Sequence, residues 1–232
     1  MNGKLRLFAI YFILIFLVSA EAALATTDSR YPKIISPSGY VIDRNTGQVL
    51  FSRAAEQSRP VASTTKIMTG LLVLELADLD ATVTISNKAA QTQGGTIGLV
   101  SGETRQVRDL LHAMMLASAN DAAVALAEHL GEGSEGKFVG FMNDRAKELG
   151  ALNTNFINPH GLADGELHFS SAKDLATIAY EAMKRSDFRE LVSTRRFTWD
   201  STSTALPVII KNTNELLDRY PLAIGIKTGY TN

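Results

Sequence analysis

A stretch of almost entirely apolar or small residues between positions 67 and 77 constrains the fold of this chain most strongly. Its residues are apolar or small on almost every side of a helical projection, which is typical of a helix buried in a core. Pro60 lies just upstream, and Ser63 stands where the N-terminus of such a helix is expected. Because residues i and i+3 share one helix face, we expect the Ser63 hydroxyl to lie beside the Lys66 amine.

A lysine at the start of so apolar a helix indicates a catalytic role, in which its amine accepts a proton. Burial lowers the pKa of a lysine because it disfavours the ammonium form, and a neutral amine can accept a proton from a hydroxyl. A capping serine followed by a surface lysine is the simpler interpretation, since Ser-x-x-Lys occurs by chance in many sequences. Two later motifs favour the chemical interpretation.

Composition excludes several classes of function. The chain has 232 residues, of which 45% are hydrophobic, so it can bury a sizeable core in one large or two small domains. The net charge of -1 argues against a nucleic-acid binder, and the absence of cysteine excludes disulfides and thiolate metal sites. The histidines show no metal-ligand spacing and no Ser-His-Asp pattern, so we expect no metal and no cofactor. The four histidines are His112, His129, His160 and His168.

The first 25 residues are typical of an export signal. Lys4 and Arg6 give a positive start, residues 7–20 are apolar, and residues 23–25 read Ala-Leu-Ala, a small-residue cleavage pattern. The apolar run is short for a membrane-spanning helix, which needs about 20 residues. An uncleaved N-terminal anchor is the alternative. Either way, we expect the remainder to work outside the cytoplasm.

The pattern of the remaining chain predicts alternating short strands and amphipathic helices. Capping of one helix by Asn120 or Asp121 is the simpler interpretation of these residues, and the alternative is that Ser118 and Asn120 hold a hydroxyl and an amide on a short connector between two packed helices. Gly131 is expected to end that helix, and residues 86–103 are expected to be mostly loop. Further helices are expected from residue 63 through the apolar run, at about 106–116 and 136–149, and from residue 170 or 171. Strands are expected at 40–42, 48–51, 196–199, 207–210 and 222–226.

Three short motifs stand in order along the chain: Ser63-x-x-Lys66, Ser118-x-Asn120 and Lys227-Thr228-Gly229. Each is weak alone, but the ordered set resembles the penicillin-recognising serine enzymes. Further stretches make it similar to the D-alanyl-D-alanine carboxypeptidases of low molecular mass. These stretches are residues 62–69, 119–123, 158–162 and 211–214, and the resemblance covers nearly all of residues 31–232.

The resemblance implies an α/β fold, in which an antiparallel sheet is flanked by helices and a helical subdomain is inserted. We therefore expect a signal peptide at residues 1–25 and a DD-peptidase catalytic domain at residues 26–232. The family has two further strands and a final helix after the Lys-Thr-Gly strand, and many members add a β-rich domain and an amphipathic membrane anchor. We infer a C-terminal truncation, which would leave an unpaired strand edge. The chain as given is then expected not to be a competent enzyme on its own, and membrane association would need an anchor from outside this sequence.

The resemblance also implies a reaction on peptidoglycan stem peptides that end in D-Ala-D-Ala. Ser63 would attack the penultimate carbonyl while Lys66 takes its proton. Ser118 would relay a proton to the nitrogen of the leaving D-alanine. β-Lactam antibiotics would acylate the same serine as inhibitors, and the enzyme would work in the periplasm or on the extracytoplasmic face of a bacterial membrane.

Residues of the second and third motifs are expected to bind the substrate. Lys227 and Thr228 offer a cation and a hydroxyl to the terminal carboxylate, and Asn120 can hold the substrate backbone. Gly229 allows a close approach of the chain. By resemblance, the backbone N–H groups of Tyr230 and of the nucleophilic serine form the oxyanion hole. A strand end with a turn glycine is the simpler interpretation of the third motif.

Several related functions stay open at this point. A class A β-lactamase carries Asp inside the second motif, where this chain has Ala119, and it needs a deacylating Glu. The stretch 148–153 resembles the region of that Glu, but its spacing differs by one residue and Gly150 is typical of a helix end. A DD-endopeptidase acting on cross-links is chemically close. A non-catalytic β-lactam-binding module and an inert fragment are the remaining alternatives, although the intact motifs argue against a dead site.

Overall fold

The computed structural model describes residues 34–162, 167–199 and 207–230. Residues from Pro37 onward form one compact unit. The expected export signal lies outside the described residues. Within them, no helix is long and apolar enough to cross a membrane.

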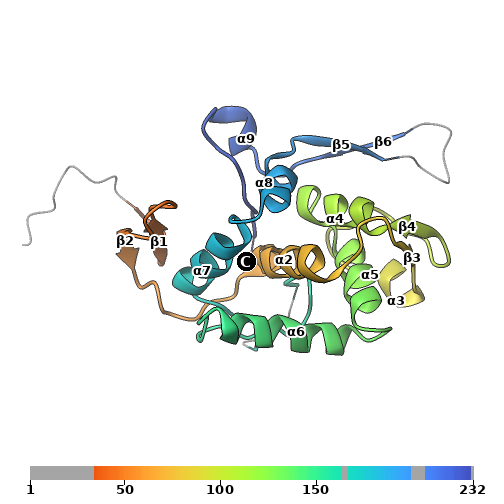
Figure 1. Ribbon diagram of the computed structural model, residues 1–232, viewed down its shortest axis with the longest axis horizontal. Helices are drawn as coiled ribbons and strands as arrows, with labels where there is room; N and C mark the ends of the chain where they lie inside the picture. The colour runs from red at the N-terminus through yellow and green to blue at the C-terminus, as the bar shows by residue number, and fades with distance from the viewer. Residues whose placement is uncertain (1–33, 163–166, 200–206, 231–232) are drawn as a thin grey trace, which may run out of the picture. The chain divides into compact units, whose positions relative to one another are not determined.

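Helices dominate the unit, and short strands join them (Figure 1). The helices are the 3-10 helix η2 (Ala62–Thr65), α2 (Lys66–Leu76), α3 (Asn87–Ala90), α4 (Val107–Leu116), α5 (Asn120–Leu130), α6 (Glu135–Glu148), α7 (Ala172–Ala182), α8 (Ser186–Ser193) and α9 (Leu216–Arg219). The strands are β1 (Gly39–Ile42), β2 (Val49–Arg53), β3 (Thr82–Thr84), β4 (Thr104–Gln106), β5 (Arg196–Trp199) and β6 (Val208–Lys211).

The described strands pair as three antiparallel couples, β1 with β2, β3 with β4, and β5 with β6. The first and third couples confirm strands expected from the sequence, whereas the β3–β4 pairing was not foreseen. The expected strand at residues 222–226 was wrong. A strand needs a hydrogen-bonded neighbour, and no strand of the described chain pairs with this segment.

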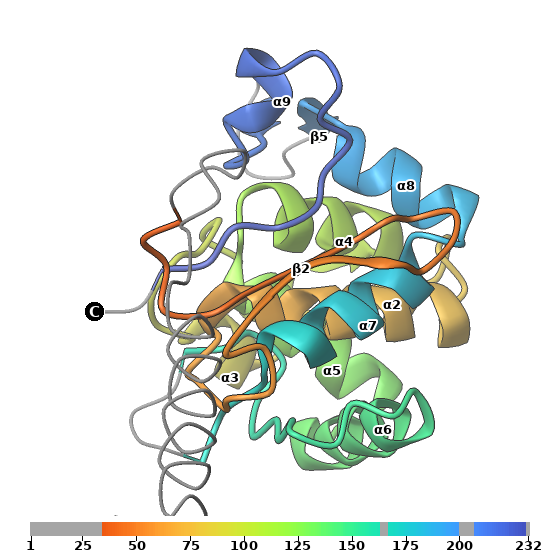
Figure 2. The ribbon, with the colours of Figure 1, turned by 90° about the vertical axis from the view of Figure 1, so that its left-hand side faces the viewer.

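Helix α2 is the centre of the unit. It contacts α4, α5, α6, α7 and α8, which surround it in both ribbon views (Figures 1 and 2). Leu71 and Val73 are fully buried although they lie on different faces of the helix. A helix packed against neighbours on all sides must be apolar nearly all round, which explains the almost entirely apolar run of the sequence.

The start of α2 differs from the expectation in one respect. Ser63 lies in the 3-10 helix η2, and the α-helix begins only at Lys66. Side chains at i and i+3 eclipse one another in a 3-10 helix. The tight turn therefore brings the side chains of Ser63 and Lys66 onto one line.

Serine side chains cap three other helices. Ser86 caps α3, Ser134 caps α6 and Ser171 caps α7, each by accepting a backbone N–H three residues later. The expected capping of α5 by Asn120 or Asp121 was wrong, since Ala119 precedes that helix without a side-chain cap. Both polar side chains are engaged elsewhere, as described below.

Replacing Leu71 by alanine should destabilise the protein by about 2–5 kcal/mol, because it leaves a cavity among the helices around α2. Leu76→Ala, at the 54% exposed end of the same helix, is the matched control and should change stability by no more than about 0.5 kcal/mol. Urea unfolding followed by circular dichroism measures both. Equal losses for the two variants would contradict the central position of α2.

Candidate active site

Lys66 occupies the centre of a hydrogen-bonded cluster at the N-terminal end of α2. Its side-chain nitrogen Nζ lies 3.0 Å from Ser63 Oγ, 2.8 Å from Asn120 Oδ1 and 2.8 Å from the backbone oxygen of His160. The lysine is fully buried, whereas Ser63 is half-buried. The structure thus brings together the first motif and the asparagine of the second, and it confirms the expected contact between Ser63 and Lys66.

The surroundings of Lys66 lower the pKa of its amine toward neutral pH. Burial and, to a lesser extent, the nearby positive charge of Lys227 lower the pKa of its amine to about 7, while Asp121 opposes the shift. Burial acts in this direction because an ammonium loses its hydration. A substantial fraction of Lys66 is therefore an unprotonated amine at neutral pH.

The Asn120 side chain is held in one orientation. Its amide nitrogen Nδ2 donates to the backbone oxygen of Gln93 at 2.8 Å, so the amide oxygen Oδ1 faces Lys66. The backbone N–H of Asn120 donates to the oxygen of Gly95 at 2.7 Å. These contacts explain why Asn120 does not cap its own helix.

Asp121 is a fully buried carboxylate next to Asn120. It accepts backbone N–H groups from Ile97, Gly98 and Leu99 at distances of 3.1 Å to one oxygen. A carboxylate with several N–H donors is well stabilised without a cationic partner. Asp121 therefore ties the loop after α3 to the N-terminal end of α5.

Ser118 lies on the connector between α4 and α5, two residues before Asn120. Its φ angle of 64° places it in the left-handed region, which costs a non-glycine residue about 1–3 kcal/mol and is found often at functional sites. Its hydroxyl is not among the hydrogen-bond partners of Lys66 in the described chain.

The third motif runs past the turn that carries Ser63. The segment after α9 descends toward the N-terminal end of α2 (Figure 1). A Cβ atom on Gly229 would lie 3.2 Å from the backbone nitrogen of Thr64 and 3.2 Å from the backbone oxygen of Val61. Glycine therefore permits the close approach of the two backbones at this point.

The side chains of the third motif range from half-buried to exposed. Lys227 is half-buried, and burial lowers the pKa of its amine to about 8. The hydroxyl of Thr228 lies 3.3 Å from that of Thr213, which belongs to the stretch 211–214 singled out in the sequence. Tyr230 is 85% exposed. The positive charge of Lys227 is thus available near Ser63 and Lys66.

The turn at residues 158–162 supplies contacts that sequence analysis missed. Besides the His160 oxygen on Lys66, the backbone oxygen of Pro159 accepts the hydroxyl of Thr69 at 2.6 Å. The Asn158 side chain closes the turn by accepting the N–H groups of His160 and Gly161. The turn itself was expected from Asn-Pro and His-Gly, but a contact made by a backbone oxygen leaves no signature in the sequence.

His168 joins the 3-10 helix η2 to the segment before the turn at residues 158–162. Its Nδ1 accepts the N–H of Ile157 at 3.2 Å, so its Nε2 carries the ring hydrogen and donates it to Thr65 Oγ1 at an N···O distance of 2.7 Å. Burial lowers the pKa of His168 to about 4, which keeps the ring neutral. Burial and the charge of Lys66 lower the pKa of His160 to about 3. Both rings are therefore uncharged at neutral pH.

Glu148 does not belong to this site. It ends α6 and pairs with Arg145 at 3.1 Å, and it lines a hollow together with Leu76 at the C-terminal end of α2. Ser63 lies beyond the other end of that helix, whose eleven residues span about 16 Å. Glu148 therefore cannot serve as a base at Ser63.

Comparison with known proteins gives a consistent result. D-alanyl-D-alanine carboxypeptidase DacF of Bacillus subtilis is 38% identical over 94% of this chain, and the chain spans 57% of that relative's length. A D-alanyl-D-alanine endopeptidase of Escherichia coli is 34% identical over 92% of this chain and 68% of its own. The chain thus spans a little more than half to about two thirds of these relatives.

Solved structures confirm the expected fold class. A mutant of the Streptomyces K15 DD-transpeptidase superposes with a TM-score of 0.81 and 38% identity, covering 87% of this chain and 83% of that chain. Residues 25–232 match the family described as D-alanyl-D-alanine carboxypeptidase. The chain therefore belongs to the D-alanyl-D-alanine carboxypeptidase family of serine peptidases.

Proposed function

We propose that this protein removes the terminal D-alanine from peptidoglycan stem peptides ending in D-Ala-D-Ala, through an acyl-enzyme on Ser63. The observation that carries the proposal is the buried Lys66 amine within 3.0 Å of the Ser63 hydroxyl. We place the catalytic domain at residues 26–232 and a signal peptide at residues 1–25, so that the protein acts outside the cytoplasm. β-Lactams are expected to acylate the same serine.

The partners of Lys66 favour its role as the base. A neutral amine has two N–H groups and one lone pair. The amide oxygen of Asn120 and the backbone oxygen of His160 can only accept hydrogen bonds. When they take both N–H groups, the lone pair is left for the third partner, the hydroxyl of Ser63. The geometry therefore supports transfer of the serine proton to Lys66.

The reaction then follows from this proton transfer. Ser63 Oγ adds to the penultimate carbonyl, and the tetrahedral adduct collapses as the bond to the terminal D-alanine breaks. The proton on Lys66 passes to the leaving nitrogen, and we assign Ser118 the role of relay. Water hydrolyses the ester on Ser63 and restores the free hydroxyl. The N–H groups of Ser63 and Tyr230 are proposed to stabilise the oxyanion.

Binding of the free terminal carboxylate is assigned to the third motif. Lys227 keeps most of its charge at neutral pH and lies close enough to lower the pKa of Lys66. The Thr228 hydroxyl adds a second donor, and Gly229 lets this segment lie against the turn of Ser63. Asn120 Nδ2 retains a second N–H beyond the one given to Gln93, which suits a carbonyl of the substrate backbone.

Endopeptidase activity is the second candidate, favoured by the name of the Escherichia coli relative. It uses the same nucleophile and differs in accepting a cross-linked peptide. A β-lactamase is disfavoured because Ala119 replaces the Asp of its second motif and Glu148 lies at the wrong end of α2. D-alanine release from a linear pentapeptide, compared with cleavage of a cross-linked dimer, separates the two peptidase activities.

Ser63 is expected to carry the adduct after treatment with a fluorescent penicillin. Intact-mass analysis and peptide mapping should find one stable label on Ser63, and Ser63→Ala should abolish both the label and D-alanine release while the thermal melt is retained. A label on Ser118 would contradict the assignment of the nucleophile. Rapid loss of the label with penicillin turnover would indicate a β-lactamase.

Lys66→Arg should lower the acylation rate at least a thousandfold. A guanidinium stays protonated and has no lone pair for the serine proton. Stopped-flow measurement with the same penicillin gives the rate, and circular dichroism reports whether the larger side chain still fits the buried site. A folded Lys66→Arg protein that acylates at the wild-type rate would show that Lys66 is not the base.

The acylation rate constant at low penicillin concentration should follow a bell-shaped pH profile with limbs at about pH 7 and about pH 8. Below its pKa of about 7 Lys66 gains a proton and no longer acts as a base, so the rate falls toward acid. Above its pKa of about 8 Lys227 loses the charge that binds the carboxylate, so the rate falls toward alkali.

Lys227→Arg separates the two limbs, because arginine keeps its charge throughout this range. The acid limb should remain and the alkaline limb should disappear. An unchanged alkaline limb in Lys227→Arg would assign that limb to another group, and a wild-type profile without an acid limb would remove Lys66 as the base.

A further inference from the structure

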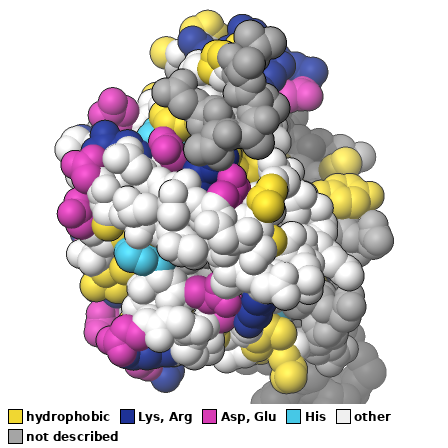
Figure 3. All heavy atoms as spheres, turned by 90° about the vertical axis from the view of Figure 1, so that its right-hand side faces the viewer, with side chains coloured by type: hydrophobic (Ala, Val, Ile, Leu, Met, Phe, Trp, Pro, Cys, Tyr) yellow, Lys and Arg dark blue, Asp and Glu magenta, His cyan; other side chains and the backbone are white. Residues whose placement is uncertain are grey.

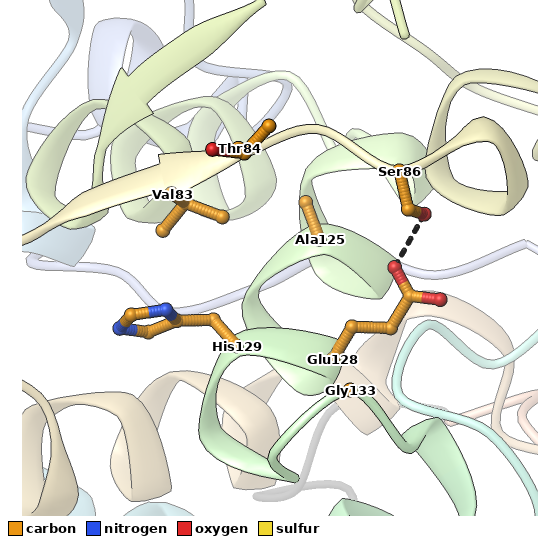
Figure 4. Close-up of a pocket in the computed structure, with 7 residues that line it drawn as sticks. All are labelled: Val83, Thr84, Ser86, Ala125, Glu128, His129 and Gly133. Atoms are coloured by element: carbon orange, nitrogen blue, oxygen red, sulfur yellow. Dashed lines mark hydrogen bonds between the residues drawn. The ribbon is translucent and has the colours of Figure 1, made fainter. Parts of the chain in front are cut away.

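The loop between α3 and β4 contains four glycines that the proposed reaction does not use. They are Gly94, Gly95, Gly98 and Gly102. The face that carries β3, β4 and α3 gathers neither apolar side chains nor charges of one sign (Figure 3). A shallow hollow of about 340 Å³ on this face is lined by both polar and apolar side chains, and it gives no sign of a ligand (Figure 4). The loop's contacts with the active site are more informative.

Gly94 lies directly on the Asn120 amide. Its φ angle is 90°, and a Cβ atom built on it would lie 2.7 Å from Asn120 Nδ2 and 3.2 Å from Leu162 Cδ2. Real Cβ atoms essentially never approach another atom as closely as 2.7 Å. Any side chain at this position would therefore displace the Asn120 amide.

The residues on either side of Gly94 hold the same asparagine. The backbone oxygen of Gln93 accepts Asn120 Nδ2 at 2.8 Å, and that of Gly95 accepts the Asn120 backbone N–H at 2.7 Å. Residues 93–95 thus contact Asn120 from one side while Lys66 contacts its oxygen from the other. The Gln93 oxygen can only accept, so it selects the orientation in which the amide nitrogen points toward the loop.

Both ends of this loop are anchored. On one side the Ser86 hydroxyl accepts the N–H of Ala89 at 3.0 Å and donates to Glu128 on α5 at 2.5 Å, which fixes α3 (Figure 4). On the other side the Asp121 carboxylate binds the N–H groups of residues 97–99. The loop is therefore held against α5 before and after residues 93–95.

We propose that residues 93–95, with Gly94 at their centre, form a positioning element that fixes the Asn120 amide and so directs the Lys66 lone pair at Ser63. The inference rests on the proposed function of Lys66 as the base. With the amide reversed, its NH₂ group would face Lys66 and donate into the lone pair that Ser63 needs. The loop excludes that arrangement.

The test compares Gly94→Ala with Gly102→Ala. Both glycines have similar positive φ angles, 90° and 84°, but a Cβ on Gly102 would meet nothing within 4 Å. The two variants therefore carry similar backbone strain, and only one disturbs Asn120. We expect Gly94→Ala to lower the acylation rate constant at least tenfold and Gly102→Ala to stay within about twofold of the wild type.

The pH profile distinguishes positioning from a general loss of structure. An NH₂ group facing Lys66 disfavours the ammonium, so Gly94→Ala should move the acid limb to lower pH, whereas Gly102→Ala should leave it in place. The rate constant is measured on labelled sites, so a smaller folded fraction lowers the amplitude and not the rate. In an Asn120→Ala background, Gly94→Ala should slow acylation no more than Gly102→Ala does.

A second pair of variants covers the case in which Gly94→Ala does not fold. Ser86→Ala removes the cap of α3 and its hydrogen bond to Glu128, whereas Ser134→Ala removes only the cap of α6. Both should destabilise the protein, Ser86→Ala the more, but only Ser86→Ala should slow acylation, by about threefold, and shift the acid limb.

The positioning role would be overturned if the two variants of each pair had equal acylation rate constants and equal acid limbs. It would also be overturned if the effects of Gly94→Ala and Asn120→Ala on the rate constant were fully additive. A wild-type protein that forms no adduct on Ser63 would instead overturn the proposed function. The two failures are therefore distinguishable in the same experiment.

Discussion

A buried amine with three fixed partners is the constraint on which the site depends. Lys66 is fully buried, and burial would be unfavourable for its charged form. The surrounding oxygens satisfy its N–H groups, while no carboxylate contacts it among the described residues, so the neutral form is favoured. The helices around α2 exclude water, and Asn120 and the turn at His160 present the accepting oxygens. Exposing the site to water would raise the pKa of Lys66 toward that of an ordinary ammonium.

Local pattern predicted much of this arrangement. The apolar run identified α2, and the spacing of Ser63 and Lys66 identified their contact, because both depend on periodicity within a few residues. The strands β1, β2, β5 and β6 and the helices α4, α6 and α7 were foreseen for the same reason. The capping role expected for Asn120 and Asp121 was wrong because loop 93–99, more than twenty residues earlier, offers those side chains better partners.

Contacts over long sequence separations were beyond the reach of the sequence. The acceptor role of the His160 oxygen belongs to the backbone and does not depend on a residue type. The pairing of His168 with Thr65 joins positions 103 residues apart. The segment 222–226 has the composition of a strand, yet pairing and not composition makes a strand. Its residues instead lead the third motif to the turn at Thr64, where Gly229 permits the approach.

The hydrogen bonds that join η2 and α2 to Pro159, His160 and His168 have a consequence for the order of events during synthesis. Thr65, Lys66 and Thr69 each bond to residues that are made 90 to 103 positions later. Closing loops of that length is slow compared with forming local helices. Until the later segment docks, the lysine remains in water with a pKa of about 10.4. A nascent or partly folded chain therefore contains the serine and the lysine but no working nucleophile, and reactivity begins only when the fold is nearly complete.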